Sequence, residues 1–197
     1  MPDAGQTTIG PVRLGWMPHR HGTPAEPLVR DWLAARLRVD AGTLRFTRAA
    51  HGRPHLLPPH AATDASWSHS GDGLLVAQAL RPGVRVGVDL ELLRPRPRAL
   101  EIARRYFTAT EAAALASVPG DQREAAFVAL WCAKEAVLKA DGRGLAFGLH
   151  RLGFARDGDA WRLVVSDPAL GPVGAWQVRA FAPRLGYLAS VAWRGQG

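Results

Sequence analysis

The sequence lacks the residues and patterns that several classes of protein require. It has one cysteine, Cys132, among 197 residues, which excludes an internal disulfide and a zinc site built from cysteines. No apolar run approaches the roughly 18 uninterrupted residues of a membrane helix, and residues 1–10 lack the basic patch and hydrophobic run of a secretory signal. We therefore expect a soluble globular protein of the reducing cytoplasm, with no membrane partner.

Lysine is scarce although the chain is basic. Lys plus Arg number 25 against 17 acids, a net charge of +8, yet only Lys134 and Lys139 are lysines. The charge favours an anionic partner, which can be nucleic acid, a phosphorylated metabolite or an acidic protein. Because an ammonium and a guanidinium are not interchangeable at a tight phosphate site, we interpret the two neighbouring lysines as functional, the alternative being a chance remnant of an Arg-rich composition.

Hydrophobic periodicity predicts an α+β protein. Helices are expected at 23–37, at 99–107, directly after it where Thr108-x-x-Glu111 resembles a capping box, and at 121–140. Strands are expected at 43–48, 65–69, 74–80, 84–91, 152–156, 161–166, 176–181 and 187–193. Turn residues at 81–83 separate two halves, each with a helix followed by a small antiparallel meander. We therefore predict two similar lobes, residues 1–82 and 83–197.

Three carboxylates are candidate metal ligands. Asp89 and Glu91 leave the same face of the strand at 84–91, roughly 7 Å apart, and Gly87 on that face leaves open space for a ligand. We expect this strand to be half-buried, and the alternative interpretation is an ordinary solvent-facing edge. Glu135 lies on the flank of the apolar arc of the long helix, so it needs a metal, Lys139, or both; the alternative is a plain surface ion pair.

The remaining candidates fit phosphate chemistry. Oxygen-only ligands in a basic surround fit magnesium held jointly by the protein and substrate phosphates. Ser68 and His69 offer a hydroxyl and an imidazole for phosphate oxygens, although such a turn is often merely solvated. Lys134 points into the apolar arc of its helix, and we expect its ammonium to reach an anion across the lobe interface. Arg53 by itself is an ordinary turn arginine.

Several of these residues stand in motifs that resemble a known family. The segments are Val86-Gly87-Val88-Asp89-Leu90-Glu91, Trp131-Cys132-Ala133-Lys134-Glu135-Ala136-Val137-Leu138-Lys139, His51-Gly52-Arg53-Pro54, Ser66-Trp67-Ser68-His69-Ser70, Phe107-Thr108 to Glu111 and Gly142-Arg143-Gly144-Leu145. Together they resemble the signature of 4′-phosphopantetheinyl transferases of the surfactin-synthetase-activating type. The resemblance covers residues 46–149 well and the flanks loosely.

The resemblance implies a fold and a reaction. The expected fold is a pseudo-twofold α+β monomer with its active site between the lobes. The expected reaction is magnesium-dependent transfer of the phosphopantetheine arm of coenzyme A to a serine of an acyl or peptidyl carrier protein, with release of adenosine 3′,5′-bisphosphate.

The resemblance also implies roles for single residues. Asp89, Glu91 and Glu135 match the magnesium ligands, and Lys139, Ser68 and His69 match phosphate contacts. Arg53 stands where the family usually has lysine, so its phosphate contact has altered geometry. Glu111 matches a position proposed for proton handling, with the capping box as the alternative. The family's basic N-terminal helix is missing, and Arg20 is the substitute we expect at the adenosine 3′-phosphate.

Two other classes stay open. A basic nucleic-acid-binding protein fits the charge and the seven tryptophans, although the arginines are dispersed and the Asp89 and Glu91 face would repel a phosphate backbone without metal. We therefore expect no nucleic-acid partner. A magnesium-dependent phosphohydrolase would use the same three acids with water. For transfer, the base is either Glu135 or a magnesium-bound hydroxide.

Overall fold

The computed structural model describes residues 5–195 and contains small antiparallel sheets and helices, which confirms the α+β prediction. The first sheet has the order β1-β2-β6-β5, made of β1 (Gly5–Ile9), β2 (Val12–Pro18), β6 (Gly73–Ala79) and β5 (Ala65–Ser70). The second has the order β10-β11-β7, made of β10 (Gln177–Phe181), β11 (Tyr187–Arg194) and β7 (Arg85–Leu92). No helix in the described range is long and apolar enough to cross a membrane.

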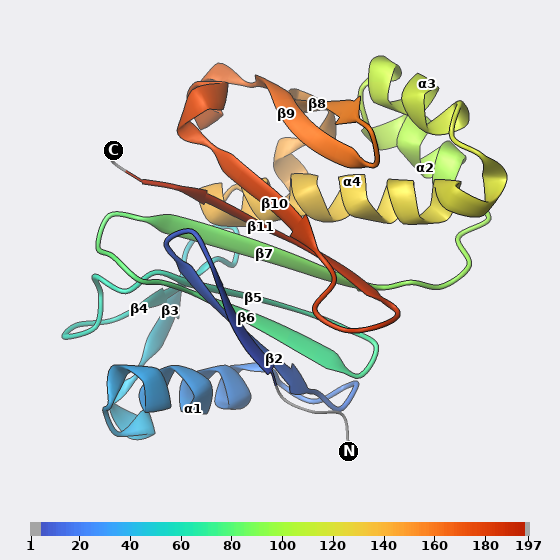
Figure 1. Ribbon diagram of the computed structural model, residues 1–197. Helices are drawn as coiled ribbons and strands as arrows, with labels where there is room; N and C mark the ends of the chain where they lie inside the picture. Colours follow the sequence, from blue (N-terminus) through green and yellow to red (C-terminus); the bar gives the residue numbers. More distant parts are fainter. Residues whose placement is uncertain (1–4, 196–197) are drawn as a thin grey trace.

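The two sheets pack face to face, with a helix on each outer side (Figure 1). Leu14, Trp16 and Leu75 of the first sheet form one buried cluster with Val88 and Val191 of the second. Burial of these apolar faces supplies the main driving force for joining the two halves of the chain. The layers therefore run from a helix through two sheets to a second helix.

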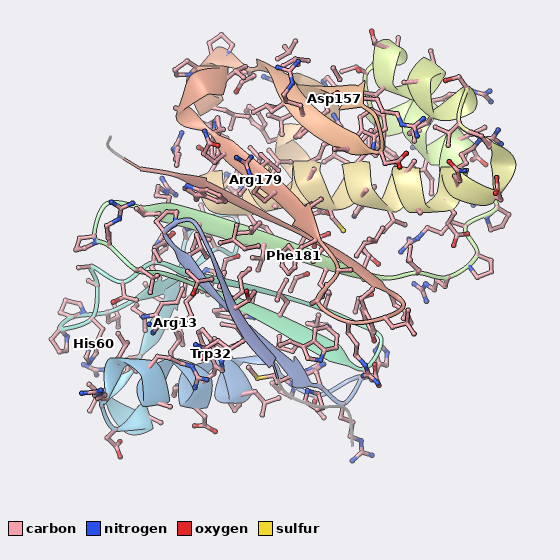
Figure 2. All side chains as sticks on the ribbon, viewed as in Figure 1. Arg13, Trp32, His60, Asp157, Arg179 and Phe181 are labelled. Carbon is pink, nitrogen blue, oxygen red and sulfur yellow. The ribbon has the colours of Figure 1, made fainter. Side chains whose placement is uncertain are left out.

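Helix α1 (Glu26–Leu37) covers the outer face of the first sheet. Its Trp32 lies directly over Gly15 of β2, where any Cβ would collide with the indole (Figure 2). Pro27 falls in the first turn, as predicted. Two strands preceding this helix, β1 and β2, and the short β4 were not predicted.

The second half adds three helices and a hairpin. They are α2 (Ala99–Tyr106), α3 (Ala109–Ala116), α4 (Gly120–Asp141), β8 (Leu152–Asp157) and β9 (Ala160–Ser166). A smaller hairpin, β3 (Phe46–Arg48) with β4 (Pro54–Leu56), belongs to the first half. The predicted helices and strands of this region are confirmed within a few residues.

The prediction that the strand at 84–91 is half-buried is wrong. Its apolar face packs on the first sheet, but its Gly87 and Asp89 face is also buried because α4 lies across it. A Cβ at position 87 would collide with Ala136 O and Ala140 N of α4. Gly87 therefore permits the close approach of helix to strand, and does not leave open space for a ligand.

Candidate active site

The strand β7 and the helix α4 bring the three candidate carboxylates into one region. Asp89 and Glu91 follow Gly87 on the α4-facing side of β7, and Glu135 extends from α4 toward them. Burial, reinforced by the negative charges of Asp89 and Glu91, raises the pKa of Glu135 to about 7, although Lys139 opposes the shift. Glu135 is thus neither a fully exposed surface acid nor half of a simple helix ion pair.

Lys139, Asp89 and Ser68 form a closed polar triangle. The Lys139 ammonium donates to Asp89 Oδ1 at 2.7 Å and to Ser68 Oγ at 3.0 Å, and Ser68 Oγ donates to the same carboxylate oxygen at 2.9 Å. Burial alone would lower the pKa of Lys139, but Asp89 and Glu135 outweigh it and raise that pKa above its ordinary value. Lys139 is therefore charged at neutral pH and lies at the centre of the site.

Glu91 lies farther along β7 and has its own cation. Arg96 Nη2 donates to Glu91 Oε2 at 2.6 Å, and Ser70 Oγ donates to the same oxygen at 3.2 Å. Within residues 5–195 no group of three or more His, Cys, Asp and Glu side chains is gathered closely enough to hold a metal ion. The three acids therefore lie in one region, where Lys139 neutralises Asp89 and Arg96 neutralises Glu91.

The residues nevertheless suit a hard divalent cation. Asp89 Oδ2 is buried and has no hydrogen-bond partner among the described residues. Because the pKa of Glu135 is raised, a cation bound beside Glu135 would stabilise its ionised carboxylate. All three candidate ligands are carboxylates, the donors that magnesium prefers. The donor set thus fits magnesium.

A cleft of about 240 Å³ opens beside this group. It is lined by Arg48, His51, Gly52, Arg53, Pro54, Ser66, Trp67, Glu135, Leu138, Lys139, Gly142 and Gly144. The lining comes from the first half of the chain on one side and from α4 and its following loop on the other. Arg48, Arg53 and Lys139 make the cleft basic, and Glu135 is the acid among the lining residues, so an anion is the complementary ligand.

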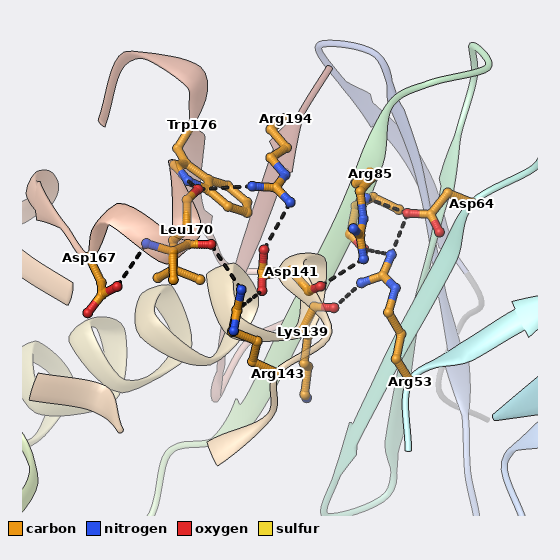
Figure 3. Close-up of polar contacts among 12 residues, drawn as sticks. Arg53, Asp64, Arg85, Lys139, Asp141, Arg143, Asp167, Leu170, Trp176 and Arg194 are labelled. Atoms are coloured by element: carbon orange, nitrogen blue, oxygen red, sulfur yellow. Dashed lines mark hydrogen bonds and ion pairs between the residues drawn. The ribbon is translucent and has the colours of Figure 1, made fainter. Parts of the chain in front are cut away.

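Arg53 lines the cleft but is bound to the protein itself (Figure 3). Its guanidinium donates to Asp64 Oδ2 at 2.5 Å, to Val86 O at 3.2 Å and to Lys139 O at the end of α4. Its side chain is only 4% exposed. The structure thus gives Arg53 a bracing role between β4, β7 and α4, which sequence reasoning did not foresee.

The end of α4 is held by further arginines (Figure 3). Asp141 accepts from Arg143 Nε and from Arg194 Nη2, both at 2.9 Å, and its carbonyl accepts from Arg85 Nη2 at 2.7 Å. Gly142 follows with φ of 94°, a left-handed conformation that suits glycine and ends the helix. Glycines 142 and 144 both line the cleft, so these arginines fix one of its walls.

A row of short polar side chains joins the two halves along β5 and β7, and we call it the side-chain seam. Val86 N, Val88 N and Leu92 N donate to Asp64 Oδ2, Ser66 Oγ and Ser70 Oγ at 2.7, 3.2 and 3.1 Å. Ser68 lies in phase with these residues, yet its hydroxyl turns to Asp89. Sequence reasoning missed the seam, although the alternation of Asp64, Ser66, Ser68 and Ser70 was a visible signal.

His69 and Arg20 lie at the edge of the site. His69 lies on β5 and is exposed to solvent. Its pKa is lowered, first by the partial desolvation of its ring and then by the neighbouring positive charges of His19, Lys139 and His21. The buried His19 ring packs on it, with centroids 4.8 Å apart, and was missed by sequence reasoning. Arg20 is exposed in the loop after β2, and nothing in the structure places its guanidinium at the cleft.

Lys134 and Glu111 lie outside the cleft, which corrects the expected role of Lys134. Both side chains are 0% exposed and their charged groups are 2.8 Å apart. Lys134 Nζ also donates to Leu149 O at 2.9 Å and Leu152 O at 2.5 Å. Because all of its donors have partners inside the protein, the ammonium does not reach an anion across the lobe interface.

Glu111 is a capping residue in the structure. Its Oε2 accepts from Thr108 N at 2.8 Å in a complete capping box, and its Oε1 accepts from Phe154 N at 2.7 Å. Both oxygens are occupied and the side chain is sealed from solvent. The capping alternative therefore accounts for Glu111, and the structure does not bring it to the other site residues.

Comparison with known proteins identifies the family to which the chain is similar. Residues 85–177 match the family model of the 4′-phosphopantetheinyl transferase superfamily. The chain is 31% identical over 179 residues to 4′-phosphopantetheinyl transferase HetI of Nostoc sp., covering 90% of this chain and 72% of that protein. It is 32% identical over 122 residues to Sfp of Bacillus subtilis, covering 62% and 52%, and 43% identical over 148 residues to psf-1 of Bacillus pumilus, covering 75% and 54%.

The chain therefore belongs to the 4′-phosphopantetheinyl transferase superfamily. It spans about half the length of most of the curated relatives that it matches. A solved holo-(acyl-carrier-protein) synthase from Bacillus anthracis, in complex with CoA, aligns with 57% of this chain and 96% of its own, at 18% identity and a TM-score of 0.41.

Proposed function

We propose that this protein transfers the 4′-phosphopantetheine arm of coenzyme A to a serine of an acyl or peptidyl carrier protein, with magnesium, releasing adenosine 3′,5′-bisphosphate. The observation that carries the proposal is the basic cleft in which Lys139 and Glu135 lie side by side on the wall formed by α4. A pyrophosphate is the anion that would use both a fixed ammonium and a site for a divalent cation.

Lys139, Ser68 and His69 would contact the phosphates. Lys139 has a raised pKa and a partly exposed side chain, so its charge is available to an anion in the cleft. Ser68 Oγ accepts a hydrogen bond from Lys139, and its hydroxyl would turn from Asp89 to donate to a phosphate oxygen. Arg53 is braced against Asp64 and would contribute its positive charge to the cleft wall, and we place Arg20 at the adenosine 3′-phosphate.

Asp89, Glu91 and Glu135 would hold the magnesium ion. When bound, magnesium would neutralise the charge that develops on the leaving phosphate. In the transfer, the serine Oγ forms a bond to the β-phosphorus while the bridging oxygen between the two phosphorus atoms leaves with the nucleotide. A Glu135 carboxylate oxygen that does not hold the ion would accept the serine proton.

The proposal includes the organisation of the whole chain. Residues 1–82 and 83–197 would act as two lobes of a cytoplasmic monomer, with coenzyme A bound between them. The net charge of +8 would speed encounter with an acidic carrier protein, an effect that weakens as salt rises.

The test is incubation with coenzyme A, magnesium and an apo carrier protein, followed by mass spectrometry. We expect the carrier to gain one phosphopantetheine while adenosine 3′,5′-bisphosphate appears in equal amount. A carrier whose acceptor serine is replaced by alanine is the control. Cleavage of coenzyme A with no gain on the carrier would favour a phosphohydrolase, and absence of both products would reject the proposal.

A further inference from the structure

A serine of β11 is buried directly beside Asp89. The row of β11 that faces α4 is Leu188, Ser190 and Ala192, which pair in register with Glu91, Asp89 and Gly87 of β7. Directly opposed residues of an antiparallel pair point to the same face of the sheet. Ser190 is 0% exposed, so its hydroxyl is enclosed between two apolar neighbours, across from the Asp89 carboxylate.

Two buried oxygens in this region have no partner. Ser190 Oγ and Asp89 Oδ2 both lack a hydrogen bond to any residue in the range 5–195. The other oxygen of Asp89 already accepts from Lys139 and Ser68. Buried polar groups are destabilising unless they are paired, and alanine at position 190 would have avoided the hydroxyl altogether. The thiol of Cys132 on α4 also interacts with Asp89, but it donates to Leu188 O at 3.8 Å. The hydroxyl of Ser190, which pairs in register with Asp89, is therefore the oxygen donor that can satisfy Asp89 Oδ2.

We propose that Ser190 is a positioning residue for Asp89. The two oxygens are not bonded to each other in the structure, so the hydroxyl would donate to Asp89 Oδ2 through one bridging water or after a change of side-chain rotamer. It would hold the carboxylate from the β11 side, opposite to Ser68 on β5. Ser190 is fully buried on the strand that α4 contacts and does not line the cleft, so it would not touch a substrate bound there. The carboxylate is thereby held in one orientation whether or not a cation is bound.

If the site holds a divalent cation, as the proposed function requires, Ser190 should also affect the affinity for that cation. Groups that hold a metal-ligating side chain from behind typically change metal affinity by about 10–100-fold when they are removed. Ser190 lies beside Asp89 on the neighbouring strand and does not contact Lys139, so its loss would weaken cation binding while leaving the phosphate contacts of Lys139 in place.

The first test is a double-mutant cycle without metal. Ser190→Ala, Asp89→Leu and the double variant are unfolded in urea in the presence of EDTA. We expect Ser190→Ala to raise the unfolding equilibrium constant about fivefold or more, and to raise it less than about twofold in the Asp89→Leu background, because leucine has no oxygen that could accept from Ser190. Equal effects in both backgrounds would overturn the proposal.

Ser166→Ala is the matched control. Ser166 Oγ on β9 is also buried without a partner among the described residues, but it lies on a different sheet from Asp89. Removing an isolated orphan hydroxyl is expected to be neutral or stabilising. A Ser190→Ala protein as stable as Ser166→Ala would overturn the proposal without need of the cycle, even if Asp89→Leu fails to fold.

The second test measures manganese binding by calorimetry, with manganese as the probe for magnesium. We expect Ser190→Ala to bind about tenfold more weakly than the parent chain and Ser166→Ala to bind equally well. Equal affinity in Ser190→Ala and the parent would overturn the proposed consequence for the cation. If the parent binds no manganese, the magnesium part of the proposed function fails, and the metal-free cycle alone decides the role of Ser190.

Discussion

Two lysines of α4, five residues apart, lie in opposite environments. The Lys134 side chain is 0% exposed and its ammonium contacts Glu111 and two backbone carbonyls. The Lys139 side chain is 30% exposed and lines the cleft. An ammonium has three donors. Those of Lys134 match three fixed partners, whereas Lys139 has two hydrogen-bond partners within residues 5–195, Asp89 and Ser68.

The comparison shows that an ion pair alone does not define a functional site. Both lysines pair with a carboxylate at 2.7 or 2.8 Å, and both belong to the same sequence motif. What separates them is unused bonding capacity next to solvent. Lys134 connects α4 to α3 and to the start of β8, so it stabilises the frame, while Lys139 presents its charge to a ligand.

The largest expected effect is the loss of the buried pair. Lys134→Met leaves the Glu111 carboxylate buried without its cation, which should lower the free energy of unfolding by about 3–5 kcal/mol in urea titration. The double variant Lys134→Met/Glu111→Leu removes both charges and should recover only part of the loss, because Thr108 N and Phe154 N then lose their acceptor. A Lys134→Met protein of unchanged stability but no activity would contradict the structural role and show that Lys134 takes part in the reaction.

The pH dependence of stability tests the same pair, with a slightly smaller effect. Burial lowers the pKa of Lys134 from 10.5 to about 8, although Glu111 opposes the shift. Between those two values the unfolded chain keeps a proton that the folded chain has released, so this group makes the free energy of unfolding rise with pH. At about 1.4 kcal/mol per unit, the rise is roughly 3 kcal/mol.

The reference for that measurement is Lys134→Met/Glu111→Leu. We expect the difference in stability between the parent chain and this double variant to change between pH 8 and 10.5 and to be flat from pH 6 to 8. A difference independent of pH over the whole range would show that Lys134 keeps its ordinary pKa despite complete burial.

Lys139→Arg should affect activity more than stability. Its ammonium fits between Asp89 Oδ1 and Ser68 Oγ, and a planar guanidinium on a longer stem cannot reproduce both contacts. Phosphopantetheine transfer should fall about tenfold, which corresponds to about 1.4 kcal/mol. Arg162→Lys, the reverse exchange on an exposed position of β9, is the control and should be neutral. Full turnover by Lys139→Arg would remove Lys139 from the phosphate site.

The sequence was sufficient to predict which helix or strand carries a residue wherever the hydrophobic pattern is local. The alternation in β7 and the helical period of α4 placed Asp89, Glu91, Glu135 and Lys139 on the correct elements. Local periodicity did not reveal that α4 lies on β7, so it could not distinguish a half-buried strand from one buried on both faces. That distinction depends on Gly87 and the backbone of α4, some fifty residues later.

Other features could not be predicted because their partners are distant in sequence. The side-chain seam pairs Asp64, Ser66 and Ser70 with backbone groups about twenty residues away. Arg53 contacts the carbonyl of Lys139 across 86 positions. Nothing in the spacing of Lys134 and Lys139 shows which one is saturated, since that depends on Glu111 and the carbonyls before β8.

Glu91→Ala should have the smallest effect. It tests whether a carboxylate that is already paired with a cation of the protein still contributes to the site. Glu91 is partly exposed and shared with Arg96 and Ser70, so it is less committed to the site than Asp89. Because magnesium can replace one carboxylate by water and keep six ligands, the magnesium concentration for half-maximal transfer should rise a few-fold while kcat changes less than about twofold. A complete loss of transfer at saturating magnesium would instead make Glu91 as indispensable as Asp89, and the pairing with Arg96 would then have to open before the enzyme turns over.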